Sequence, residues 1–247
     1  MKLIFTYCLL IILSPIVVPA QLIAIHTAVH KVIYDQKPFI RHDPNASLHF
    51  LFIGDSTCVG TGAADPSQSV AGRFGQDFPQ ASIDNIGVNG RKLDGLIAAF
   101  NPSPTEHYNL VVVQIGGNDI MQLTSFAKID REISIIIKRA KSVGRHVVIL
   151  HSGNVGLGPI FIWPVSWVMT ERARAMRALY MKKAKEEGVI YIDLFLERKD
   201  DLFLKDVDKY YSKDHLHPSG WGYKWWYDRI RATMDKNLGP SYFGETK

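Results

Sequence analysis

The chain has few cysteines, and it lacks a spaced set of cysteine and histidine residues of the kind that binds zinc. Its two cysteines, Cys8 and Cys58, lie in an apolar N-terminal stretch and in a glycine-rich motif, so we expect no structural disulfide. Repeats, low-complexity tracts and long blocks of one charge are also missing. The formal net charge of +5 is modest for 247 residues, and the basic cluster in 171–187 has acidic residues at both ends. These absences argue against a zinc-binding domain and against a nucleic-acid-binding protein.

The first 25 residues differ from the rest of the chain. Lys2 precedes a long apolar stretch, and Val18, Pro19 and Ala20 offer small residues at which a signal peptidase could cut. A stretch of about 20 apolar residues can also span a bilayer. We therefore predict that residues 1–25 are a signal peptide or a membrane anchor, and that the protein is periplasmic, secreted or membrane-anchored. A buried N-terminal helix of a cytosolic protein is a third alternative.

The remaining sequence has enough apolar residues for a single domain. Hydrophobic residues make up 47% of the chain, and no shift in composition marks a second domain. The polar residues 26–45 are typical of a linker. We predict that the domain spans residues 46–240.

Short runs rich in valine, isoleucine and leucine alternate with longer amphipathic stretches. The predicted strands are 48–53, 82–86, 110–115, 146–150 and 189–194. The predicted helices are 70–78, 92–100, 128–143, 171–187 and 219–235. Strands that are apolar on both faces and alternate with helices predict an α/β protein, in which helices cover both sides of a parallel sheet of about five strands.

Four motifs follow the ends of four of these strands. In chain order they are FIGDSTCVG around Ser56, NIGVNG around Gly90, IGGND around Asn118, and KDHLHP around Asp214 and His217. In an open parallel sheet the carboxyl ends of the strands meet at one edge, where ligands bind. The sequence therefore predicts an active site at this edge.

The residue types in these motifs fit acyl transfer. The Ser56 hydroxyl can act as a nucleophile if a base accepts its proton, and His217 can be that base if Asp214 holds its tautomer. The Ser56 N–H, the Gly90 N–H and the Asn118 side-chain amide can serve as an oxyanion hole. Each motif taken alone is equally compatible with an ordinary turn or helix start, and the inference rests on their joint occurrence.

The ordered set resembles the SGNH hydrolases, the GDSL-type esterases and lipases, from about residue 48 to the last predicted helix. The name of that group is made of Ser, Gly, Asn and His, found here as Ser56, Gly90, Asn118 and His217. The resemblance implies a flavodoxin-like fold, a Ser-His-Asp triad, hydrolysis of acyl or acetyl esters through an acyl-enzyme, and neither a metal nor an organic cofactor. The chain departs from the GDSL name at Thr57, which leaves the subfamily open.

Some neighbouring residues are assigned structural roles. We expect Asp55 to brace the serine loop, Asp119 to cap the turn that follows it, and His215 to be an exposed turn residue. Cys58 is interpreted as a small buried residue. The aromatic residues of WGYKWWYDR are interpreted as the buried face of the last helix.

The segment between the fourth strand and the next helix carries the only indication of substrate. Phe161, Trp163 and Trp167, together with Met169, could line an acyl or alcohol pocket, face a lipid surface, or pack as a cover on the core. The expected partner is a small-molecule, lipid or glycan ester, and the sequence does not reveal the oligomeric state. Two other functions stay open: transfer of an acyl group to a cell-envelope glycan, and a membrane-tethered binding protein without catalysis.

Overall fold

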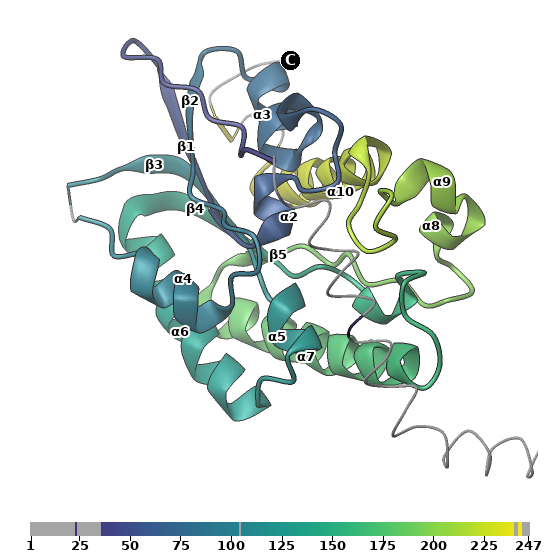
Figure 1. Ribbon diagram of the computed structural model, residues 1–247. Coiled ribbons are helices and arrows are strands. Elements are labelled where there is room, and N and C mark those ends of the chain that lie inside the picture. The colour runs from purple at the N-terminus through teal and green to yellow at the C-terminus, as the bar shows by residue number, and fades with distance from the viewer. Residues whose placement is uncertain (1–22, 24–35, 104, 240–241, 244–247) are drawn as a thin grey trace, which may run out of the picture.

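The computed structural model describes residue 23 and residues 36–103, 105–239 and 242–243. In this part of the chain, five parallel strands form one sheet in the order β2-β1-β3-β4-β5 (Figure 1). The strands are β1 (Leu48–Gly54), β2 (Ala81–Asn85), β3 (Tyr108–Gln114), β4 (Gly144–Leu150) and β5 (Ile190–Tyr191). The strand order reverses between β1 and β3, and such a switch point opens a crevice beyond the strand ends. Ser56 follows β1 directly, so it lies at this crevice.

Helices cover both faces of the sheet, as the sequence predicts. One face carries α4 (Leu93–Ala99), α6 (Phe126–Val143) and α7 (Val165–Glu187), and the other carries α3 (Val70–Asp77) and α10 (Gly220–Leu238) (Figure 1). Short helices lie in the connections after β1, β3 and β5: α2 (Ser56–Val59), α5 (Gly117–Met121), α8 (Leu202–Lys205) and α9 (Val207–Tyr210). Two 3-10 turns, Pro66–Gln68 and Val155–Leu157, complete the described elements. The α/β/α fold class is confirmed.

The side chains of β1, an inner strand of the sheet, pack alternately into the two helical layers. Phe50 and Phe52 pack into the layer of α3 and α10, whereas Leu51 and Ile53 pack into the layer of α4, α6 and α7. Successive side chains of a strand point to opposite faces, so a strand covered on both sides must be apolar throughout. These four side chains are almost completely buried. Burial of each such side chain contributes about 1.5–3 kcal/mol.

The strand and helix predictions agree with the structure except at two places. The last strand is much shorter than the predicted 189–194, because only Ile190 and Tyr191 pair with β4. The helix that the sequence predicts to begin at residue 171 begins instead at Val165, within the segment that the sequence places between the fourth strand and the helix. Residues 165–170 have weak helix propensity, but Val165 and Met169 are buried in the core, and tertiary packing overrides propensity.

The described part of the predicted linker, residues 36–45, lies against the domain. Arg41 pairs with Ile83 of β2, and its guanidinium donates to the carbonyls of Gly75, Phe78 and Ala81. The predicted signal or anchor at 1–25 and residues 26–35 lie outside the described residues, apart from Ile23. Within the described residues, no helix combines the length and apolar character required to cross a membrane.

Candidate active site

The nucleophile motif forms a tight turn from β1 into α2. Asp55 caps α2, and its Oδ1 accepts hydrogen bonds from both the N–H and the hydroxyl of Thr57. Gly54 has φ +157°, and a Cβ there would lie 1.8 Å from the carbonyl oxygen of Gln114 on β3. Only glycine allows this approach of the two strands. As a result, Ser56 occupies the first position of α2, where the helix leaves its backbone N–H without a helical partner.

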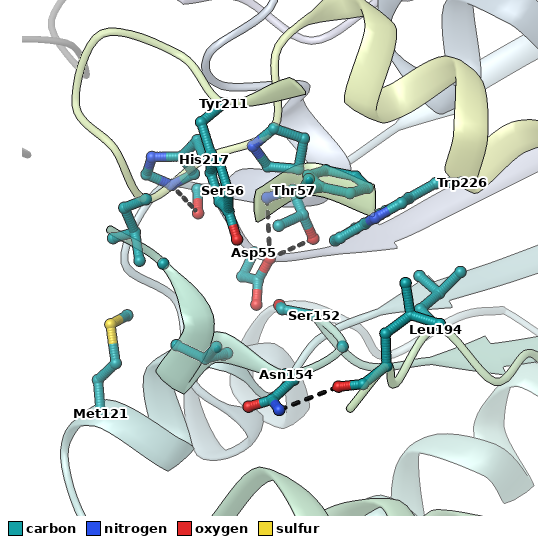
Figure 2. Close-up of a pocket in the computed structure, with 18 of the residues that line it drawn as sticks. Asp55, Ser56, Thr57, Met121, Ser152, Asn154, Leu194, Tyr211, His217 and Trp226 are labelled. Atoms are coloured by element: carbon teal, nitrogen blue, oxygen red, sulfur yellow. Dashed lines mark hydrogen bonds between the residues drawn. The ribbon is translucent and has the colours of Figure 1, made fainter. Parts of the chain in front are cut away.

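Three of the predicted catalytic side chains form a continuous hydrogen-bonded chain (Figure 2). The Ser56 Oγ lies 2.8 Å from the His217 Nε2, and the His217 Nδ1 lies 2.5 Å from the Asp214 Oδ2. All three residues are buried, although Ser56 and His217 are 161 positions apart in the sequence. This is the geometry in which a histidine can accept the proton of a serine hydroxyl while a carboxylate fixes its tautomer.

Hydrogen bonds from residues of the same turn fix the orientation of the Asp214 carboxylate. Its Oδ1 accepts from the Ser212 hydroxyl at 2.6 Å and from the N–H groups of Leu216 and His217, both at 2.9 Å. Burial alone would raise the pKa of Asp214, but the hydrogen bond and the charge interaction with His217, together with the other donors, lower the pKa well below its ordinary value. Asp214 is therefore anionic at neutral pH and its Oδ2 is directed at the imidazole.

A hydrogen bond joins the loops that carry the two other predicted oxyanion donors, Gly90 and Asn118. Asn118, on α5, donates from Nδ2 to the carbonyl of Arg91 at 3.1 Å, so one amide hydrogen is engaged and the second can face the reacting carbonyl. Gly90 is exposed with φ +75°, a left-handed conformation that favours glycine, and a Cβ there would meet nothing within 4 Å.

Asp119, the residue after Asn118, adds a second hydrogen bond between these two loops. Its Oδ2 accepts from the N–H of Leu93 at the start of α4, at 3.1 Å. It thus caps a helix in the neighbouring connection. Burial raises the pKa of Asp119 to about 6, against the lowering effect of hydrogen bonds from Leu93 and Thr124.

His215 and Cys58 have the structural roles expected of them, whereas the aromatic residues of the last helix are only partly buried. His215 is exposed in a left-handed turn conformation, with φ 57°. Cys58 is buried with its Sγ 3.3 Å from the Asn85 Oδ1, and burial raises the pKa of its thiol well above the ordinary value. The last helix buries Tyr223, Trp226 and Tyr227, while Trp221 is exposed.

The predicted substrate residues differ in how deeply they are buried. Phe161 is packed into the core, whereas Trp163 and Trp167 are 41% and 60% exposed. None of the three lines the cavity beside Ser56. Met169 is buried in the same core layer as Phe161.

A cavity of about 70 Å³ adjoins the Ser56 hydroxyl on the side of β4 and β5 (Figure 2). Asn118 and His217 border it near the nucleophile. Its lining includes the polar and aromatic side chains of Asp55, Ser152, Asn154, Asp201, Tyr211 and Trp226, together with apolar side chains such as Met121, Leu194 and Phe203. The motifs of the sequence do not single out most of these residues, although the GN pair at Gly153 and Asn154 after β4 is a turn signal at the predicted edge.

The described residues offer no metal site, since no group of three histidine, cysteine, aspartate or glutamate side chains could hold an ion within that part of the chain.

Ser56, His217 and Asp214 lie in contact at the carboxyl edge of an α/β/α sandwich, an arrangement typical of serine hydrolases. More specifically, the chain belongs to the GDSL-like lipase/acylhydrolase family, whose family model matches residues 52–225. This range includes Ser56, Gly90, Asn118, Asp214 and His217. Comparison with curated proteins gives no match.

Solved structures share the fold at low sequence identity. The crystal structure of TesA superposes with a TM-score of 0.59 at 20% identity, over 76% of this chain and 98% of that one. A member of the lipolytic G-D-S-L family from Veillonella parvula gives 0.56 at 19% identity, over 74% and 96%. An acetylxylan esterase from Geobacillus stearothermophilus gives 0.54 at 17% identity, over 78% and 96%. At these identities the similarity establishes the fold alone.

Proposed function

We propose that the protein is a serine esterase that hydrolyses carboxylic esters. The observation that carries this proposal is the chain of contacts from Ser56 through His217 to Asp214. Membership of a family of lipases and acylhydrolases supports an ester as the substrate.

In the first half of the reaction, the Ser56 Oγ attacks the ester carbonyl carbon while the His217 Nε2 takes the hydroxyl proton. The carbonyl oxygen becomes an oxyanion, which accepts hydrogen bonds from the N–H groups of Ser56 and Gly90 and from the Asn118 amide. Collapse of this intermediate breaks the bond to the alcohol, which leaves with the proton carried by His217. The acyl group is then esterified to Ser56.

In the second half, a water molecule attacks the acyl-enzyme carbonyl and gives its proton to the His217 Nε2. A second oxyanion forms in the same hole and collapses to release the carboxylic acid, and the Ser56 Oγ regains its proton from His217. The Asp214 carboxylate stays anionic throughout and stabilises the imidazolium in both steps.

The test is hydrolysis of p-nitrophenyl esters from acetate to dodecanoate, with Ser56→Ala as the paired variant. We expect a serine-dependent rate that is highest at short chains, because the cavity beside Ser56 is small. Release of p-nitrophenol without release of free acid, with the acyl group found on an added alcohol, would indicate an acyltransferase instead. The absence of any serine-dependent rate would contradict catalysis by this site.

We also propose that the domain works outside the cytoplasm, on the strength of the apolar residues that follow Lys2. N-terminal sequencing of the full-length protein purified from cells tests this. A start near Gln21 supports a cleaved signal, and an intact N-terminus that requires detergent supports an anchor. An intact N-terminus on a protein that remains soluble without detergent would contradict both.

A further inference from the structure

Arg172, on α7, reaches across to the short helix that carries Asn118. Its Nε donates to the Ile120 carbonyl at 3.0 Å, and its Nη2 donates to the carbonyls of Thr124 at 2.6 Å and Asp119 at 3.3 Å. These carbonyls belong to α5 and to the turn that follows it. The last carbonyls of a helix lack the usual helical donors, and here Arg172 supplies donors to them from another helix.

The guanidinium of Arg172 is itself held in place by an aromatic ring. Its central carbon lies 4.8 Å from the centroid of the Phe126 ring, at the start of α6, within the range of a cation–π contact. A guanidinium is planar and carries five N–H donors in a fixed arrangement, which allows it to bond several carbonyls at once. A lysine ammonium is a compact charge at the end of a flexible chain and lacks this arrangement.

A second contact from α7 fixes the other end of the IGGND motif. Tyr180 donates from its hydroxyl to the Ile115 carbonyl at 3.1 Å. Between Arg172 and Tyr180, Met176 lies so close to Gly116 that a Cβ there would come within 2.7 Å of the Met176 Sδ. Arg172, Met176 and Tyr180 are spaced four positions apart, so they share one face of α7. This face holds the motif from its first residue to the turn beyond it.

The position of the Asn118 side chain depends on this support. Asn118 lies in the first turn of α5, a helix of five residues, and its Nδ2 donates to the Arg91 carbonyl. A shift or rotation of α5 would therefore move the amide relative to Ser56. Donors of an oxyanion hole must lie about 2.7–3.1 Å from the developing charge, and a displacement of about 1 Å is enough to slow a reaction strongly.

We propose that Arg172 is a positioning residue for the reaction, which fixes α5 so that the Asn118 amide faces the oxyanion. Arg172 is not among the residues that line the cavity beside Ser56, so it acts through α5 rather than on the ester. This inference rests on the proposed esterase function and on the proposed role of Asn118. Loss of the guanidinium should then impair the chemical step and leave binding of the ester unchanged.

The test is Arg172→Lys, which keeps the positive charge and the alkyl chain but loses the planar set of donors. With p-nitrophenyl acetate we expect kcat to fall by about 10- to 100-fold and KM to change by less than about twofold, the result of a misplaced oxyanion donor. Arg174→Lys is the matched control, because Arg174 lies on the same helix and its guanidinium bonds the Glu197 carboxylate instead. This control should leave kcat unchanged.

A double-mutant measurement separates positioning from a general loss of stability. In an Asn118→Ala background there is no amide to position, so Arg172→Lys should lower kcat further by less than about twofold. A purely structural effect on the domain would lower kcat by the same factor in both backgrounds. The melting temperatures of all variants are measured in parallel, and Arg172→Gln takes the place of Arg172→Lys if the lysine variant does not fold.

Equal losses in the two backgrounds would overturn the inference, and so would an unchanged kcat or an equal loss in Arg174→Lys. Failure of both Arg172 variants to fold would assign Arg172 a structural role and overturn it as well. A loss below about tenfold for Asn118→Ala alone has the same consequence, because there is then no oxyanion donor to position. All these outcomes leave the esterase proposal standing as long as Ser56→Ala abolishes the rate. If no ester shows a rate that Ser56→Ala abolishes, both proposals fail.

Discussion

Replacement of Asp214 by asparagine should inactivate the site without unfolding it, and the reason lies in how the two oxygens are used. The Oδ1 accepts three hydrogen bonds, from Ser212, Leu216 and His217, whereas the Oδ2 faces the His217 Nδ1. An asparagine amide has one oxygen, and the three donors will hold it in the Oδ1 position. The amide nitrogen then donates to the His217 Nδ1, which moves the imidazole proton to Nε2. That tautomer cannot accept the proton of Ser56.

The expected loss of activity follows from the free energy required to hold the asparagine amide in the opposite orientation. To restore the productive tautomer, the amide must turn its nitrogen toward the donors, which leaves the two backbone N–H groups of Leu216 and His217 unpaired. Each unpaired buried donor costs about 1–3 kcal/mol, so the flip costs about 2–6 kcal/mol. With about 1.4 kcal/mol for each factor of ten, kcat/KM should fall by about 30-fold to 10⁴-fold.

The assay compares kcat/KM for p-nitrophenyl acetate with the melting temperature of the same preparations. Asp214→Asn should melt within a few degrees of the unmodified protein because the turn keeps its three hydrogen bonds. Asp214→Ala removes their acceptor and should melt lower, and the exposed neighbour Asp208→Asn should change neither quantity. A folded Asp214→Asn variant that keeps more than a tenth of the activity would refute the tautomer argument.

Three further substitutions test other parts of the site and fold. Asn118→Ala should lower kcat by about 10² to 10³ if its amide is an oxyanion donor, and a loss below tenfold in single-turnover kinetics would remove it from that role. Gly62→Ala should impair activity with p-nitrophenyl acetate, because Gly62 has φ +97° and the new Cβ would lie 2.9 Å from the Cβ of His217 and 2.6 Å from the Pro218 carbonyl oxygen. An unchanged kcat/KM would show that the turn can shift without any effect on catalysis. Burial lowers the pKa of His151 from 6.5 to about 4, so the unfolded chain binds its proton first and stability is lost as the pH falls from 6.5 to 4. His151→Phe should reduce that loss by up to about 3 kcal/mol in urea titrations across this range, and an unchanged pH dependence would exclude His151 as its source.

The sequence could predict the sheet and its active edge because both depend on local patterns. Short runs rich in β-branched residues, such as VVVQI, which ends at Ile115, indicate strands buried on both faces, and their alternation with helices favours a parallel sheet. A parallel sheet then brings the motif residues to one edge whatever their separation in the chain. This is why the sequence alone places Ser56, Asp214 and His217 together.

The substrate side could not be predicted, because it has no motif. Asp201, Tyr211 and Trp226 come from three separate elements and meet at the cavity only after packing. Trp163, just before α7, and Trp167, near the start of α7, were predicted to be substrate residues because of their aromatic side chains, but both are exposed in the structure. The aromatic content of a segment does not show which way its side chains point or how deeply they are buried, because both depend on tertiary contacts.

The proposed catalysis also relies on residues outside the triad, which connect the motifs to one another. The Asn85 amide joins two motifs, since its Nδ2 donates to the Cys58 carbonyl on α2 and its Oδ1 accepts from the Gly87 N–H ahead of Gly90. Asp119 joins a third, through the N–H of Leu93 at the start of α4. These buried hydrogen bonds hold the loops of the proposed oxyanion donors in a fixed position relative to Ser56. Donors held in place in this way need no reorganisation when the oxyanion forms, which is the condition under which they accelerate the reaction most.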